Sequence, residues 1–132
     1  MARADGYLLD THALIWWWLS DPRLPENVRA LMAAPDLPIY VSAISAYEIG
    51  LKVRTGELAI LAEALDTFGE SVEDEGFRNL PIRCEHTAKA AMLGDTSKDP
   101  FDRIIASQAL AEDMIVLSRD KSMAVFGCKT VW

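Results

Sequence analysis

The sequence predicts an α/β fold with three layers, α/β/α, in which helices cover both faces of a central, mostly parallel sheet. The first observation is that short apolar, β-rich segments alternate with longer segments of helical periodicity, a pattern typical of parallel sheets that are covered on both faces. The second is the length of 132 residues, which suits one domain with a core of its own. No repeat, low-complexity tract or linker divides the chain, so residues 1–132 are expected to form a single domain.

The first half of the chain is expected to contain two strands and four helices. Short apolar runs predict strands at residues 7–9 and 39–41. Apolar residues at helical spacing, with proline near several ends, predict four helices. They are expected at residues 11–20, from Pro25 to about Pro35, from Ser45 to about Gly56, and at residues 61–72. The last helix has an acidic outer face, expected to be solvated, at Glu63, Asp66, Glu70 and Glu73.

The second half is expected to add three strands and three helices. A short strand within residues 77–82 is expected near a sheet edge, because Pro81 cannot donate a backbone hydrogen bond there. Residues 85–93 are an alanine-rich helical segment, residues 94–98 a polar loop, and residues 114–118 the strongest strand signal. A short helix after Arg119-Asp120-Lys121 and a last strand at residues 129–132 complete the pattern.

The remaining helix has an unusually clear beginning at Asp99-Pro100. An aspartate at the N-cap accepts hydrogen bonds from the first backbone N–H groups, and proline is favoured next because its missing N–H needs no partner there. Ile104 and Ile105 then belong to an apolar face at helical spacing. Asp102 lies in the first turn, so its carboxylate is expected to project from the amino end of a buried helix.

The charge balance limits which partners the whole surface can bind. The chain has 20 acidic and 13 basic residues and a net charge of −7, which argues against a broad basic surface for nucleic acid. A polyanion would need a local group of bases or a bound cation, and a basic partner is the alternative. The basic residues near the acid-bearing segments could form such a group, or each could simply be a solvated charge. They are Lys52, Arg54, Lys98, Arg103, Arg119 and Lys121.

The sequence indicates a cytoplasmic protein without a membrane segment. Its longest apolar run, Ala13–Leu19, has seven residues, whereas a bilayer span needs roughly 20. Six residues precede the first apolar segment, which Asp10 and His12 interrupt, so a secretory signal is not expected. Cys84 and Cys128 lack metal-type spacing and are expected to be reduced thiols in the core.

Three consecutive tryptophans, Trp16, Trp17 and Trp18, lie in the first predicted helix. At about 100° per residue they cover a wider arc than one buried stripe requires. At least one is therefore expected to face outward or to contact another chain, a second copy or a partner protein, while the others fill the core.

Four acidic residues are expected to meet at one edge of the sheet, where ligands of open parallel sheets bind beyond the carboxyl ends of the strands. They are Asp10 after the first strand, Glu48 in the first turn of the third helix, Asp102 in the helix before the fourth strand, and Asp120 after that strand. Clustered carboxylates repel one another, and Mg²⁺ or Mn²⁺ would relieve the repulsion. A phosphodiester bound there would be neutralised and attacked by a metal-activated water.

Each acid also has a purely structural interpretation, and the pattern alone leaves both open. Asp10 and Asp120 can cap helices, Ser45 and Glu48 fit a capping box, and Asp102 can complement a helix dipole. Two histidines are weaker candidates. Helical spacing would turn His12 away from Asp10 by about 200°, which argues against a general base or ligand, and His86 has no acidic or cysteine neighbour at ligand spacing.

Four segments resemble the PIN-domain family, with the closest likeness to VapC-type toxins. They are Leu8-Leu9-Asp10-Thr11-His12, Ser42-x-x-Ser45-x-x-Glu48-Ile49, the run from Asp99-Pro-Phe-Asp102-Arg to Ala109, and Leu117-Ser-Arg-Asp120; residues 48–58 resemble the family as well. The likeness spans essentially the whole chain, and Asp-Pro-Phe-Asp-Arg is its most specific part.

The resemblance implies a PIN-like fold and an endoribonuclease that depends on Mg²⁺ or Mn²⁺. It further implies the toxin of a type II toxin–antitoxin pair, with RNA as substrate, a cognate antitoxin as inhibitor and usually a homodimer. By that pattern the metal-binding, catalytic acids are Asp10, Glu48, Asp102 and Asp120. Thr11 and Ser42 would orient water or a carboxylate, and Asp99 would support the ligands from outside the set.

Two alternatives belong to other functional classes. An aspartate-dependent phosphatase would suit Asp10 after a strand, but that chemistry typically needs a second aspartate two residues on, where His12 stands. A non-catalytic PIN-like interaction module would keep the fold while the acids act only as caps. Titration with metal ions distinguishes this module from a nuclease.

Overall fold

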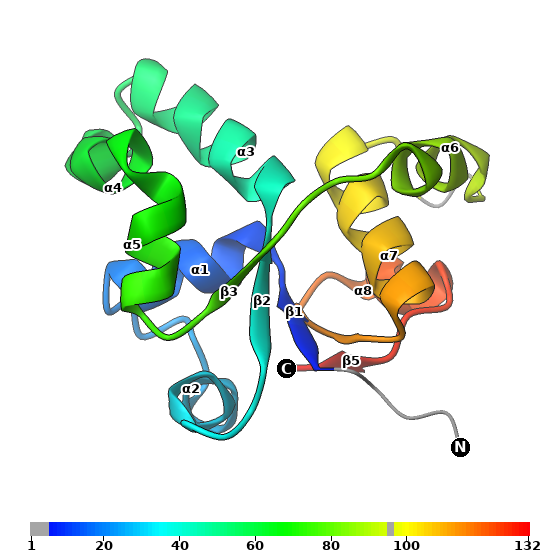
Figure 1. The fold of residues 1–132 in the computed structure, drawn as a ribbon, viewed down its shortest axis with the longest axis horizontal. Helices are drawn as coiled ribbons and strands as arrows, with labels where there is room; N and C mark the ends of the chain where they lie inside the picture. Colours follow the sequence, from blue (N-terminus) through cyan, green and yellow to red (C-terminus); the bar gives the residue numbers. More distant parts are fainter. Residues whose placement is uncertain (1–5, 95–96) are drawn as a thin grey trace.

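The computed structural model describes residues 6–94 and 97–132 and is built around one five-stranded sheet, in which every pairing is parallel (Figure 1). The strand order is β3-β2-β1-β4-β5. The strands are β1 (Tyr7–Leu9), β2 (Ile39–Ser42), β3 (Arg78–Leu80), β4 (Ile115–Leu117) and β5 (Thr130–Val131). The predicted α/β/α fold is confirmed, and the sheet is wholly parallel rather than mostly so. Part of the predicted loop 94–98, Asp95 and Thr96, lies outside the described residues.

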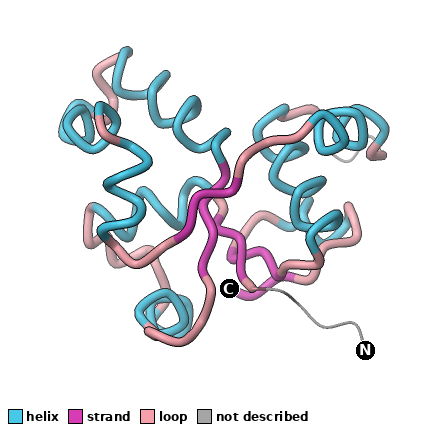
Figure 2. Tube along the Cα trace, in the orientation of Figure 1, coloured by secondary structure: helices cyan, strands magenta, loops and turns pink. Residues whose placement is uncertain are grey.

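Helices cover both faces of this sheet (Figure 2). They are α1 (Thr11–Trp18), α2 (Glu26–Ala33), α3 (Ala43–Arg54), α4 (Ala62–Asp66), α5 (Phe68–Asp74), α6 (Cys84–Met92), α7 (Pro100–Glu112) and α8 (Lys121–Val125), with a 3₁₀ turn, η1 (Ala59–Leu61). In Figure 1, α1 to α5 lie on one side of the strands and α6 to α8 on the other.

The two layers of helices bury two separate apolar clusters. Neighbouring residues of a strand point to opposite faces, so Leu9 packs with α1 and α2 while Leu8 packs with α7 and α8. Both leucines are completely buried, which is why the strand has apolar residues at consecutive positions instead of alternating polar ones. This packing fixes the end of β1, and therefore Asp10, relative to the first turn of α7.

The helix predicted across residues 61–72 is divided in the structure. The chain leaves the helical conformation at Thr67 (φ −122°, ψ 48°), which separates α4 from α5. The Thr67 hydroxyl bonds to the Ser71 hydroxyl at 3.1 Å, and such side-chain hydrogen bonds compete with helical ones. The acidic residues of this region, Glu63, Asp66, Glu70 and Glu73, are all exposed as predicted.

Helix α3 begins two residues earlier than the sequence pattern indicated. Its N-cap is Ser42, whose hydroxyl accepts from the Ile44 backbone N–H at 3.1 Å. Ser45 instead bonds to the Thr11 hydroxyl at 2.8 Å. The capping box of Ser45 with Glu48 is therefore wrong, and Glu48 lies in the second turn of the helix and not in the first.

None of the three tryptophans is an exposed side chain. Trp16 is buried, and the other two are partly buried against the same apolar cluster. The Trp17 indole packs against Phe77 and donates to Glu75 at 2.6 Å, and Trp18 meets Phe68 edge-on. Phe77 and Phe68 of α5 cover part of the arc that the sheet leaves open, so Trp17 and Trp18 are only partly exposed, and contact of a tryptophan with another chain stays a prediction.

The two cysteines are both free thiols, but only one lies in the core. Cys128 is buried, and burial raises the pKa of its thiol to about 11. Cys84 is exposed at the start of α6, so the prediction of a core position is wrong for this residue. Within the described part of the chain, the structure contains no helix with the length and apolar character needed to cross a membrane.

Candidate functional site

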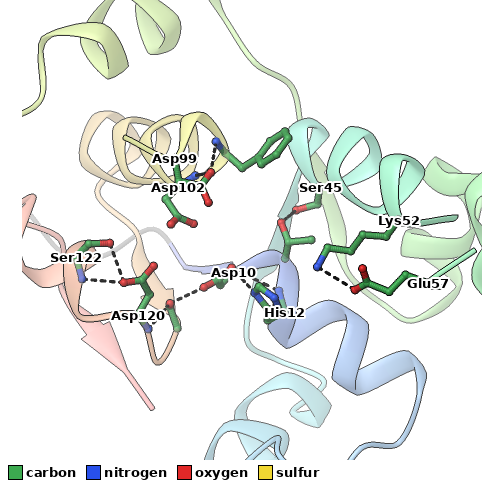
Figure 3. A network of polar contacts seen from close by, with 12 residues as sticks. Asp10, His12, Ser45, Lys52, Glu57, Asp99, Asp102, Asp120 and Ser122 are labelled. Carbon is green, nitrogen blue, oxygen red and sulfur yellow. Dashed lines mark hydrogen bonds and ion pairs between the residues drawn. The ribbon is translucent and has the colours of Figure 1, made fainter. Parts of the chain in front are cut away.

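A pocket of about 480 Å³ opens beyond the carboxyl ends of β1 and β4. It collects residues from the start of α1, the start of α7, the segment after β4 and the end of the chain. Four of its lining residues are acidic, Asp10, Asp99, Asp102 and Asp120, and the others are His12, Ala13, Trp16, Arg119, Lys121 and Trp132. Three of the four predicted metal ligands thus line one pocket, and Figure 3 shows their carboxylates facing a common space.

Asp10 is positioned by both central strands. Its backbone N–H donates to the Leu117 carbonyl of β4 at 3.1 Å. Its side chain caps α1 by accepting from the His12 N–H at 3.4 Å, and it accepts a 2.6 Å hydrogen bond from the Ser118 hydroxyl. The carboxylate therefore acts as a cap and also lines the pocket, so the structural and functional interpretations of Asp10 are compatible.

Asp120 is held by its own helix. Its side chain caps α8 by accepting from the Ser122 backbone N–H at 2.9 Å and from the Ser122 hydroxyl at 2.8 Å. Burial raises the pKa of Asp120, but the hydrogen bonds from Ser122 and Asp102 outweigh it and hold the pKa below its usual value. This carboxylate is an anion at neutral pH.

Asp102 has the opposite electrostatic environment. Burial, a hydrogen bond with Asp120 and the charges of Asp10 and Asp99 together raise its pKa to about 8. Asp99 caps α7 by accepting from the backbone N–H groups of Phe101 at 2.9 Å and of Asp102 at 3.4 Å. Burial and neighbouring negative charge both disfavour the charged form of a carboxyl group, and here both act in the same direction.

Glu48 approaches the same acids from α3 but does not line the pocket itself. Burial raises its pKa, a hydrogen bond with Thr11 lowers it, and the charge of Asp10 raises it further, with a net upward shift. The Thr11 hydroxyl thus contacts both Glu48 and Ser45, and its role in orienting a carboxylate stays a prediction. Ser42 caps α3 and is completely buried, so its contact is with the helix backbone.

Ser118 is a site residue that sequence reasoning missed. Its hydroxyl donates to Asp10 and accepts from the Asp120 backbone N–H at 2.9 Å, which links two of the acids through a buried side chain. The available signal was its place between the last residue of β4 and Asp120. A serine there resembles any strand-ending polar residue, and nothing in the sequence showed that Asp10 would lie opposite.

His12 lies closer to the acids than helical spacing predicted. Its Nδ1 is 3.8 Å from the Asp10 Oδ1, and the hydrogen bond with Asp10 raises the pKa of the imidazole. The step of 100° per residue did not apply, because Asp10 is the N-cap and has extended backbone (φ −63°, ψ 148°) instead of helical backbone. The argument against a site position for His12 is therefore wrong.

His86 also has an acidic neighbour, but in a different part of the fold. Its Nδ1 accepts from the Arg83 N–H at 2.9 Å, and its Nε2 lies 3.1 Å from Glu112 Oε2 of α7. Glu85, His86 and Glu112 are the described residues whose potential ligand atoms lie within 4.8 Å of one another. Because both ring nitrogens already have partners, this buried histidine joins α6 to α7.

The predicted basic residues have different roles in the structure. Arg119 and Lys121 line the acidic pocket. Lys52 pairs with Glu57 at 3.5 Å beside the site (Figure 3). Arg103 is directed away, and its guanidinium donates to five backbone carbonyls between Ala90 and Ser97. Arg54 and Lys98 are exposed.

The donor set fits a hard divalent cation. Carboxylate oxygens are the protein ligands that Mg²⁺ and Mn²⁺ prefer. Burial and the neighbouring carboxylates raise the pKa of Asp102, and a bound cation would favour its charged form. Asp10, Asp102 and Asp120, with Glu48 beside them, are the residues that would hold such an ion.

The fold and the site together define the class of protein. It is a wholly parallel α/β domain with an acidic pocket, and at this pocket the carboxyl ends of the central strands meet the N-termini of three helices. The family model described as the PIN domain matches residues 7–127. The chain belongs to the PIN domain family.

Solved structures with the same fold come from several bacteria. A crystal structure of FitAcB from Neisseria gonorrhoeae matches with 24% identity and a TM-score of 0.66, covering 96% of this chain and 96% of that one. VapBC2 from Rickettsia felis, bound to a DNA fragment from its promoter, matches with 16% identity and a TM-score of 0.69, covering 95% and 96%. A toxin–antitoxin complex from Klebsiella pneumoniae matches with 22% identity and a TM-score of 0.62, covering 96% and 97%. No curated protein sequence is similar enough to count as a match.

Proposed function

We propose that the chain is a metal-dependent endoribonuclease, the VapC-type toxin of a toxin–antitoxin pair, which hydrolyses RNA phosphodiesters. The observation that carries the proposal is the pocket in which Asp10, Asp102 and Asp120 converge, with Asp102 strongly shifted toward its neutral form. PIN domains are generally nucleases and generally use divalent metals, which supports the same chemistry.

In this proposal the acids hold Mg²⁺ or Mn²⁺ and the surrounding hydroxyls fix the acids. When bound, the ion supplies charge neutralisation for the phosphodiester and a more acidic water for the attack. The Ser118 hydroxyl keeps Asp10 oriented, and the two hydrogen bonds from Ser122 keep Asp120 anionic. Thr11 fixes Glu48. Arg119 and Lys121 at the pocket provide positive charge for the RNA backbone, which the net charge of −7 does not provide elsewhere.

The partners belong to the proposal as well. Each of the solved structures from Rickettsia felis and Klebsiella pneumoniae is a complex by its description, the second of them a toxin with its antitoxin. A cognate antitoxin, a homodimer and a cytoplasmic location are proposed here by analogy. Besides the partly exposed Trp17 and Trp18, apolar surface for such partners is offered by exposed side chains such as Met92 and Leu110, which line a groove between α6 and α7.

Sequencing the RNA ends produced by brief expression tests the function directly. The active protein should create new ends in single-stranded regions, and an Asp10→Asn control should not. Identical end profiles from both proteins would refute the ribonuclease. The non-catalytic module and the phosphatase would then be separated by metal titration and by hydrolysis of a small phosphomonoester.

A further inference from the structure

The acidic pocket has a second half made of aromatic and cationic side chains. Trp16, Trp132 and His12 provide the rings, and Arg119 and Lys121 provide the positive charges. The acids account for a metal ion and a phosphate, but they do not explain why aromatic rings line the same cavity. With a volume of about 480 Å³, the pocket lies within the usual range for small-ligand sites.

Trp16 is the buried residue against which the other groups of the aromatic and cationic half of the pocket pack. It is only 3% exposed, and its ring is surrounded by other flat groups. The guanidinium groups of Arg23 and Arg119 each lie 4.8 Å from its centroid, and the rings of His12 and Trp132 lie at 5.6 Å and 5.8 Å. Cation–π and tilted ring contacts of this kind hold the neighbouring groups in place without using their hydrogen-bond donors.

The groups that Trp16 supports remain partly accessible. Trp132 is partly exposed and Arg119 is exposed, so each presents surface to the pocket. Across residues 6–94 and 97–132, neither Arg119 nor Lys121 forms an ion pair. The pocket therefore joins a π-surface and two unpaired cations to a cluster of carboxylates, and its ligand should combine a flat ring with a nearby anion.

We propose that this half of the pocket binds one unpaired nucleobase of the RNA, with Trp132 as stacking partner and Arg119 and Lys121 on the adjoining phosphates. The proposal rests on the ribonuclease function proposed above and adds to it a subsite for one base. A base in a duplex is already stacked on both sides, whereas an unpaired base can stack on an aromatic side chain. Stacking accepts every base, so this subsite contributes affinity for single strands more than choice of sequence.

Substitutions at Trp132 test the subsite, because they can distinguish the effect of its aromatic ring from the effect of its apolar volume. Trp132→Phe keeps a ring, and Trp132→Leu keeps apolar volume against the core without a π-face. With a fluorescently labelled single-stranded RNA and Mn²⁺, the leucine variant should raise KM about tenfold with kcat nearly unchanged, and the phenylalanine variant should restore most of the affinity. Arg119→Gln should also raise KM, whereas Arg54→Gln, at an exposed arginine on α3, should not. Thermal melting confirms that each variant is folded.

A binding measurement separates this proposal from the ribonuclease proposal. In an Asp102→Asn background, fluorescence anisotropy reports RNA binding independently of cleavage. Trp132→Leu should bind the single strand more weakly, without an equal loss of affinity for the same RNA annealed to its complement. This result would support the subsite even if the wild-type protein cleaves no RNA. In that case only the ribonuclease proposal would fall. Equal single-strand affinity and KM in Trp132→Leu and wild type would overturn the subsite, even if wild type cleaves RNA.

Discussion

Glu48 is the acid whose role depends most on where its helix begins. Because α3 starts at Ala43 with Ser42 as its cap, Glu48 is too far along the helix to close a capping box. Its partner is the Thr11 hydroxyl, which also contacts Ser45. A half-buried carboxylate that is fixed by a hydroxyl and placed near Asp10 is better suited to holding a cation than to stabilising the helix.

We expect Glu48→Gln to separate activity from folding. The amide oxygen can still accept from Thr11, and the loss of one negative charge reduces repulsion with Asp10, so the melting temperature without metal should stay the same or rise slightly. RNA cleavage should fall by about 100-fold or more, which corresponds to about 3 kcal/mol of transition-state stabilisation. Cleavage rates with Mg²⁺ and a metal-free melt measure the two effects. Cleavage near the wild-type rate would remove Glu48 from the site.

Ser118→Ala should affect metal dependence more than fold. The substitution removes the 2.6 Å hydrogen bond to Asp10 and the acceptor for the Asp120 N–H, at a cost of about 2 kcal/mol. Because Asp10 loses one of its two hydrogen bonds and the Asp120 backbone loses its acceptor, more Mg²⁺ or Mn²⁺ should be needed for half-maximal cleavage. Ser107→Ala is the matched control, since this buried serine bonds only to the Ile104 carbonyl of its own helix at 2.9 Å. An unchanged metal requirement in Ser118→Ala would show that the serine is only structural.

The sequence predicted those site residues that mark the ends of elements. Asp10, Asp99 and Asp120 cap helices, and a cap is visible in a short sequence window. The long-range contacts were not accessible in this way. Ser118 and Asp10 are 108 residues apart, and His86 and Glu112 are 26 apart, so only the packing of the sheet and of α6 on α7 brings each pair together.

At the scale of elements, Arg103 of α7 connects this helix to the end of α6, in addition to the contact between His86 and Glu112. The guanidinium of Arg103 donates to the carbonyls of Ala90 at 3.0 Å, Gly94 at 2.9 Å and Ser97 at 2.7 Å, and also to those of Ala91 and Leu93. Several of these carbonyls belong to the end of α6, where the helix leaves them without partners. Arg103 thus connects the end of α6 and Ser97 to α7, the helix whose first turn carries Asp102.

Arg103→Lys should therefore lower both stability and activity. A lysine ammonium has three donors on a flexible chain and cannot reproduce the planar fork of a guanidinium, so we expect a loss of about 1–3 kcal/mol from the unpaired carbonyls. Cleavage should fall because Asp102 is less well placed. Arg54→Lys controls for the change of residue type at an exposed position. Chemical denaturation and cleavage rates measure the two losses, and wild-type behaviour in both would contradict this role.

Element boundaries were predicted least well where side chains compete with the backbone. The position of α7 follows directly from Asp99-Pro100, whereas α3 begins at Ser42 and not at Ser45 because Ser45 bonds to Thr11. The break at Thr67 depends on a similar competition with Ser71. At α3 a long-range contact of Ser45 set the boundary, whereas at Thr67 the competing hydrogen bond is local.

At the scale of the whole molecule, the acidic pocket should make the stability of the metal-free protein depend on pH. The folded-state pKa of Asp102 is about 8, above its ordinary value of 3.8, so the folded protein binds a proton that the unfolded chain releases near pH 4. The contribution of Asp102 to the free energy of unfolding should therefore be largest below pH 4 and should fall as the pH rises toward 8. In EDTA, Asp102→Asn should flatten this decline, because asparagine does not titrate.

Metal should reverse the trend, and this is the sharpest test of the cluster as a cation site. A cation competes with the proton on Asp102, so its binding should strengthen as pH rises, and ligand binding to the folded state raises the melting temperature. The increase caused by Mn²⁺ should therefore be larger at pH 8 than at pH 6. Asp102→Asn should reduce the increase at both values and remove its pH dependence, while Asp113→Asn, at the other end of α7, should behave as wild type. An equal increase at both pH values in wild type, or an undiminished one in Asp102→Asn, would place the bound metal elsewhere on the protein.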